Sequence, residues 1–198
     1  MRIYPEKIKL SVLPGTWLLF SFCMLFIPFS WLMAWLLAAT IHELSHIAVL
    51  RFYKARIYRI QIGILGAQIQ TEPLNRKIEF LSACAGPLIG VILSSLGRWV
   101  PRIAICALFQ TVCNLIPYNN QDGVRILRCL LRLGLNAMQC DQVLNIISLF
   151  CRIVGFLAVI WIGSCLCKEI AFYILVFYII RLIAGAKIPC KQRQQIVQ

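Results

Sequence analysis

The two histidines of this chain lie four residues apart, in the segment His42-Glu43-Leu44-Ser45-His46. Residues four apart share one face of a helix, so both imidazoles can bind the same metal ion. Zinc accepts histidine nitrogens at about 2.0–2.1 Å. Glu43 would then lie beside the metal, where a carboxylate can take a proton from water. The spacing therefore predicts a zinc hydrolase, with His42 and His46 as ligands and Glu43 as the catalytic base.

The chain that must position this motif is strongly apolar. Hydrophobic residues make up 61% of its 198 residues and charged residues 14%, against roughly 45–50% and 25% in soluble domains. A chain of this length cannot bury so much apolar surface in one core. Composition therefore excludes a soluble domain and a disordered chain, and predicts an integral membrane protein. We interpret the net charge of +13 as an orientation signal rather than as a sign of nucleic-acid binding.

The apolar segments predict an all-α polytopic membrane protein with about six transmembrane helices. We expect one intramembrane domain over residues 1–186, followed by a short basic tail over 187–198. The heavier Lys and Arg clusters fall on alternate connections, so both termini and the active site are expected on the cytoplasmic side. The expected spans are Leu13–Pro28, Trp31–Phe52, Phe80–Leu96, Ile103–Pro117, Ile153–Cys167 and Ile170–Ala184.

The connection between the second and third spans has a different pattern. Over Ile57–Thr71, apolar and polar residues alternate around Gly63 and Gly66. Alternation is the period of a β-strand, and the glycines allow a turn. We therefore expect a short β-hairpin on the cytoplasmic side, with an ordinary connecting loop as the alternative.

A catalytic zinc site needs a third protein ligand and an open position. No histidine remains, and the acidic candidates outside the motif are Glu6, Glu72, Glu79, Asp122, Asp141 and Glu169. The expected topology favours Asp122, because it follows a span that returns to the membrane face nearest His46. Glu169 falls on the opposite face. Glu72 and Glu79 lie on the correct face, but at the hairpin exit and at a helix start.

Asp122 lies in a segment that breaks the fourth span. Pro117, Asn119, Asn120 and Gly123 surround it, and these residue types end helices. Non-helical backbone at membrane depth is tolerated only where protein or a water-filled cavity covers it. A broken span with a carboxylate therefore suits a hydrated metal site. Asp122 could also cap the helix that follows, or do both.

Two motifs together resemble the paired signature of the site-2 proteases, which are intramembrane zinc metalloproteases. The layout is similar to the compact six-span type represented by the stage IV sporulation protease. We expect neither a CBS nor a PDZ module, because only twelve residues follow Ala186. The motifs are His42-Glu43-x-x-His46 and Asn114-x-x-Pro117-x-x-x-x-Asp122-Gly123, and Ala85-Gly86-Pro87 is similar to that family's Gly-Pro element.

The resemblance implies a role for each matching residue. His42, His46 and Asp122 would hold Zn²⁺, and Glu43 would act first as general base and then as general acid. Asn114 would hydrogen-bond the substrate or the oxyanion, although an interhelical polar contact is the alternative. The hairpin would offer its edge to an extended substrate strand. Structural support would come from Gly86, Pro87, Pro117 and Gly123.

The function predicted from the sequence is an intramembrane zinc endopeptidase of the regulated intramembrane proteolysis type, in the cell membrane. Its expected partners are a membrane-tethered protein substrate, the lipid bilayer and a membrane regulator or inhibitor, with no nucleic acid. Three alternatives stay open. They are a small basic membrane cysteine peptidase, a zinc protease whose third ligand is a downstream Glu, and a catalytically silent zinc-binding protein or regulator. A role in sporulation also stays open.

Overall fold

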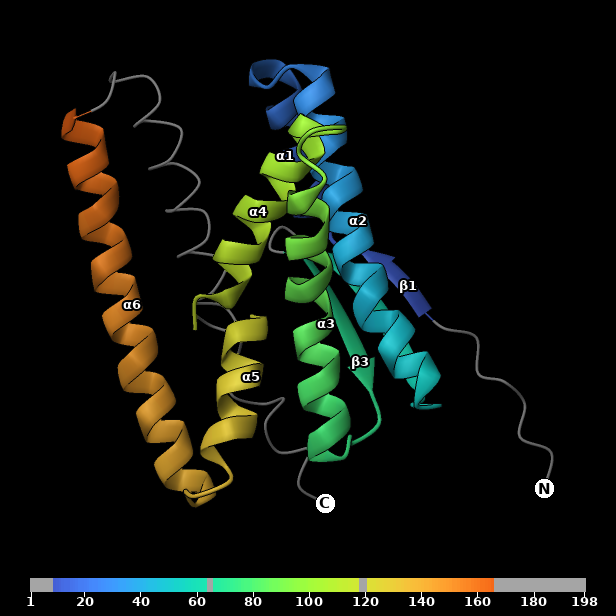
Figure 1. Ribbon diagram of the computed structural model, residues 1–198, viewed down its shortest axis with the longest axis vertical. Coiled ribbons are helices and arrows are strands. Elements are labelled where there is room, and N and C mark those ends of the chain that lie inside the picture. Colours follow the sequence, from blue (N-terminus) through green and yellow to red (C-terminus); the bar gives the residue numbers. More distant parts are fainter. Residues whose placement is uncertain (1–8, 64–65, 118–120, 166–198) are drawn as a thin grey trace.

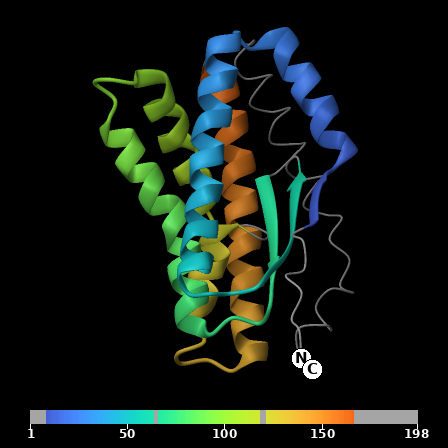
Figure 2. The same cartoon turned by 90° about the vertical axis from the view of Figure 1, so that its right-hand side faces the viewer.

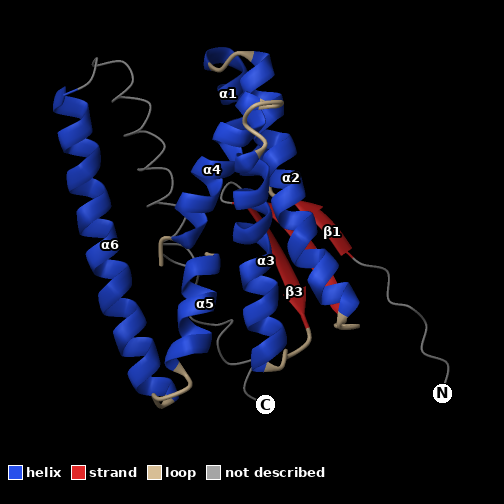
Figure 3. Cartoon of the chain, viewed as in Figure 1, coloured by secondary structure: helices blue, strands red, loops and turns tan. Residues whose placement is uncertain are grey.

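The computed structural model describes residues 9–63, 66–117 and 121–165. Helices dominate this part of the chain, and a small sheet lies beside them (Figures 1 and 3). The elements, in chain order, are β1 Lys9–Val12, α1 Pro14–Phe26, α2 Phe29–Phe52, β2 Ile57–Gly63, β3 Gly66–Thr71, α3 Arg76–Ser95, α4 Pro101–Leu115, α5 Asp122–Leu131 and α6 Ala137–Cys165.

Three helices are long and apolar enough to cross a membrane, within the residues that the structure describes. They are α2, α3 and the Ala137–Gly155 part of α6, whereas α1 and α4 are apolar but shorter. Large apolar side chains point outward on these helices; for example, Leu25 is 78% exposed and Phe150 is 65% exposed. A membrane protein is therefore supported, but the prediction of six spans is not. The sixth predicted span, Ile170–Ala184, lies outside the described residues.

The fifth predicted span, Ile153–Cys167, covers only the second part of a longer helix. α6 begins at Ala137, where Gln139 and Asp141 lower the local hydropathy and hid the helix start from hydropathy alone. Its N-terminus is capped, because the backbone N–H of Asn136 donates to the side-chain carbonyl of Gln139 at 3.2 Å. This is one half of a capping box.

The expected hairpin is present, but it belongs to a larger sheet. β2 and β3 pair antiparallel from Ile57↔Thr71 to Gly63↔Gly66. β1 pairs parallel with β2, and the strand order is β1-β2-β3. The structure therefore has a third strand in addition to the predicted hairpin. The four-residue β1 is too short to show an alternating pattern, which is why the sequence did not predict it. The sheet lies beside the C-terminal half of α2 (Figure 2).

Small side chains bring α2, α3 and α4 close together. Ala34 and Ala38 of α2 pack on Cys106 and Ala107 of α4 in one buried cluster. Small residues at helix contacts permit close packing in membranes, where lipid is as apolar as the side chains. On α3, a Cβ atom at Gly90 would collide with the hydroxyl of Thr111. The glycine at position 90 therefore allows α3 and α4 to pack this closely.

We expect Gly90→Ala to destabilise the protein by about 1–3 kcal/mol, the usual cost of overpacking. Gly97→Ala is the matched control, because a Cβ atom there would meet its neighbours at 3.5 Å or more. Thermal unfolding in detergent would measure both variants. Equal melting temperatures for the two variants would contradict the close approach of α3 and α4.

Candidate metal centre

α2 carries both histidines on the face that it turns into the helix bundle. His42 and His46 are each only 4% exposed, and their ring centroids lie 4.9 Å apart. The four-residue spacing on a continuous helix produces this arrangement. The two imidazoles are therefore presented together to the inside of the bundle.

Asp122, the first residue of α5, reaches both histidines. Its Oδ2 atom lies 3.1 Å from Nε2 of His42 and 3.2 Å from Nε2 of His46. The ligand atoms of the three residues all lie within 4.8 Å of one another. Among the described acidic residues, none of Glu72, Glu79 and Asp141 joins this group. The structure thus brings together the three residues that the sequence proposed as ligands.

The break between α4 and α5 places Asp122 at this point. α4 ends at Leu115, and α5 starts at Asp122. A Cβ atom at Gly123 would collide with the carbonyl group of Leu115, so the absent side chain lets α5 start against the end of α4. The carbonyl of Pro117 accepts a hydrogen bond of 3.0 Å from the hydroxyl of Ser148 on α6. α6 therefore helps to hold the segment that leads to Asp122.

α3 supports the two histidines in two ways. Nδ1 of His46 donates to the carbonyl of Ser82 at 2.7 Å, as metal-binding histidines do with the ring nitrogen that is not a ligand, and Nε2 faces Asp122. Gly86 lies against both rings, and a Cβ atom there would be 2.5 Å from Nε2 of His42 and of His46. Pro87 follows within the same helix and is buried. Because Gly86 has no side chain, the Nε2 atoms of His42 and His46 stay uncovered on the side that faces α3.

Glu43 lies beside this group and contacts the sheet. Its Oε1 atom accepts a hydrogen bond of 3.2 Å from the backbone N–H of Ala67 in β3. The side chain is only partly buried, so a small molecule can reach it. Asn114 of α4 lies on the other side, with Nδ2 at 3.0 Å from Nε2 of His42. Glu43 and Asn114 thus both lie at the edge of the histidine and aspartate group.

The local electrostatics keep Asp122 ionised. Burial opposes the charged form, but hydrogen bonds from His42 and His46 outweigh it and lower the pKa of Asp122 to about 2. The guanidinium of Arg125 adds a weaker contact, with Nη1 at 3.8 Å from Oδ1. A carboxylate that is charged at neutral pH can accept a cation without first losing a proton.

The residues present fit a divalent metal, and zinc in particular. Two imidazole nitrogens and one carboxylate oxygen form the three-ligand set that catalytic zinc sites use. The three side chains are buried, and the Nε2 atoms of both histidines face Gly86. A metal ion held there would meet no side chain from Gly86, which would leave room for a water molecule or a substrate group.

Several contacts of this site had no signal in the sequence. The carbonyl of Ser82 and the N–H of Ala67 are backbone groups, so no residue type marks them. Ser148 lies within an apolar helix far along the chain, and only the fold places it beside Pro117. By contrast, side-chain chemistry and spacing were sufficient to identify His42, Glu43 and His46 as candidates.

Comparison with known proteins shows which fold the chain resembles. No protein-family model and no curated protein matches the sequence. Among solved structures, the chain is similar to the site-2 protease from Methanocaldococcus jannaschii, with a TM-score of 0.62 and 19% sequence identity. The match covers 96% of this chain and 94% of that one. The chain has the site-2 protease fold. The resemblance to that family is therefore confirmed in three dimensions.

We expect Asp122→Ala to lower zinc affinity by more than the roughly 10–100-fold typical of an outer-shell partner, because it removes a predicted ligand. Asp141→Ala on α6 is the control, because Asp141 lies outside the cluster. Metal analysis of the detergent-purified variants, followed by competition with a chelator, would measure the difference. Full zinc retention by Asp122→Ala would exclude it as the third ligand.

Proposed function

We propose that this chain is an intramembrane zinc metalloendopeptidase that cleaves a membrane-tethered protein substrate. The convergence of His42, His46 and Asp122 beside Glu43 carries the proposal. The site-2 protease fold supports it. We further propose a multi-pass protein of the cell membrane, with both termini and the active site toward the cytoplasm, as the distribution of Lys and Arg favours.

Each side chain of the site has a part in the proposed reaction. His42, His46 and Asp122 would hold zinc, which would supply Lewis-acid chemistry: a lowered pKa of water and a polarised carbonyl. Glu43 takes the proton of the attacking water and passes it to the leaving amine. The amide of Asn114 donates a hydrogen bond to the carbonyl oxygen as it gains negative charge.

The sheet is suited to bind the substrate. A helical substrate hides its peptide bonds in its own hydrogen bonds, so it must unwind before water can attack. Within the part of the chain that the structure describes, β3 is an edge strand, and the N–H of Ala67 points away from β2 toward Glu43. Backbone groups alternate in direction along an antiparallel strand, so the N–H of Ile69 also points to the free edge. An extended substrate segment can pair there, with its peptide bond close to Glu43.

We expect Glu43→Gln to lower the rate of cleavage by about 10²–10⁴-fold, the usual contribution of a general base. Its zinc content should stay unchanged, because Glu43 is not one of the predicted ligands. Glu79→Gln, on the first turn of α3, is the control for loss of a carboxylate. Cleavage of a panel of membrane-anchored substrates in vesicles would be measured by gel electrophoresis.

Three results would separate the proposal from its alternatives. Equal cleavage by Glu43→Gln and the parent protein would contradict the proposed mechanism. Zinc binding without cleavage of any substrate would instead favour a catalytically silent zinc-binding protein. Loss of activity on cysteine alkylation, with no effect of chelators, would favour a cysteine peptidase.

A second prediction concerns the edge of β3. Ile69→Pro removes one N–H donor from the free edge, while the hydrogen bonds to β2 are kept, because proline is tolerated on this side of an edge strand. We expect the KM for a membrane-anchored substrate to rise severalfold, with unchanged zinc content. Circular dichroism would verify the fold. An unchanged KM would place the substrate elsewhere.

A further inference from the structure

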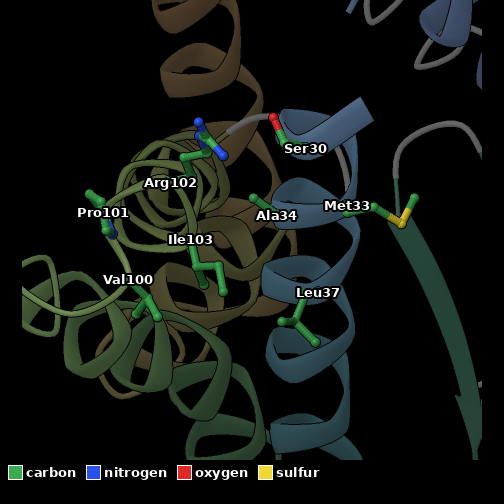
Figure 4. A pocket seen from close by; sticks show the side chains of 8 residues that line it. All are labelled: Ser30, Met33, Ala34, Leu37, Val100, Pro101, Arg102 and Ile103. Carbon is green, nitrogen blue, oxygen red and sulfur yellow. The ribbon is translucent and has the colours of Figure 1, made fainter. Parts of the chain in front are cut away.

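A groove of about 430 Å³ lies between the N-terminal ends of α2 and α4. It is at the opposite end of α2 from the metal centre: Ser30 is twelve residues before His42, about 18 Å along a helix. Figure 4 shows the groove from close by. The residues that line it are Ser30, Met33, Ala34, Leu37, Val100, Pro101, Arg102 and Ile103.

The groove is polar at one end and apolar along the rest of its length. Ser30 and the guanidinium of Arg102 lie together at the upper end in Figure 4, and Leu37 lies at the lower end. Met33, Ala34 and the residues of α4 between these ends contribute apolar surface. A groove with one charged end and an apolar remainder suits an amphiphilic molecule better than a water-soluble metabolite.

The polar end of the groove is positively charged. Arg98 and Arg102 flank the short connection between α3 and α4, and both are exposed. Among the described residues, no carboxylate forms an ion pair with either guanidinium. Trp99, between them, is 73% exposed, and tryptophan concentrates at the membrane–water boundary. Two arginines and a tryptophan at that level would lie among lipid phosphates.

The position of these arginines makes them unusual. In the orientation proposed above, the α3–α4 connection lies on the membrane face away from the cytoplasm, where Lys and Arg are depleted. Orientation of the chain therefore does not account for them. An anionic ligand at this end of the groove would account for them, because it supplies a counter-charge that the described residues do not provide.

We propose that this groove binds an anionic phospholipid, with its phosphate against Arg102 and Ser30 and one acyl chain along Met33, Leu37 and Ile103. The site is separate from the metal centre, so the proposal does not depend on proteolytic activity. A lipid seated here would contact both α2, which carries His42 and His46, and α4, which leads to Asp122. It would thereby brace the two helices where they meet the membrane surface.

The test uses the full chain in phosphatidylcholine nanodiscs, with and without about one part in five of phosphatidylglycerol. Native mass spectrometry would count bound phosphatidylglycerol, and thermal unfolding would report its stabilising effect. We expect the parent protein to bind phosphatidylglycerol more tightly than phosphatidylcholine. Arg102→Gln should lower the affinity for phosphatidylglycerol about fivefold, the contribution of one basic side chain near an anionic surface.

Arg76→Gln is the matched control, because Arg76 is an exposed arginine on the first turn of α3 at the other end of the bundle. It should lower the affinity less than Arg102→Gln does, because Arg76 lies outside the groove. An equal loss in Arg76→Gln and Arg102→Gln would overturn the proposal, since it would indicate general charge attraction. Glycerol phosphate, which has no acyl chains, should not stabilise the parent protein. Equal stabilisation by glycerol phosphate, or equal binding of both lipids, would also overturn it.

Discussion

Hydrocarbon cannot hydrate a charge, so polar groups inside a membrane bundle must satisfy one another. Here two imidazoles and one carboxylate do so, because Asp122 lies within 3.2 Å of both histidines. The rest of the fold follows from this requirement. α4 must end before the chain reaches Asp122, and α3 must approach closely enough for the backbone carbonyl of Ser82 to accept a hydrogen bond from Nδ1 of His46. The contacts that could hold a cation therefore also allow these three polar side chains to be buried.

The close packing of the helices depends on glycines, which have no side chain. Gly86 leaves room for the histidine rings, Gly90 for Thr111, and Gly123 for the end of α4. Each position lies at a different contact, yet all three act on the same distances around the site. A methyl group at Gly86 or Gly90 would press on side chains of the neighbouring helices, and one at Gly123 would press on the backbone at the end of α4. The glycines therefore determine how far apart the ligand-bearing helices can be.

Much of the site could be predicted from the sequence, because side-chain type and spacing are local properties. His42, Glu43 and His46 follow from one helical turn, and Asp122 follows from the side of the membrane to which its span returns. The number of spans was less predictable. α1 and α4 are apolar but short, and polar residues near Asp141 concealed the start of α6. The parallel pairing of β1 depends on contacts far apart in the chain, which no local pattern records.

β1 has a mechanical consequence. It ends at Val12, and α1 begins two residues later at Pro14. Between them, the N–H of Leu13 donates to the carbonyl of Ile62 at 2.9 Å, and the hydroxyl of Thr16 donates to the same oxygen. α1 is therefore fastened to β2, and β3 in turn contacts Glu43 through Ala67. A tilt of α1 would therefore be transmitted through the sheet to the carboxylate of Glu43.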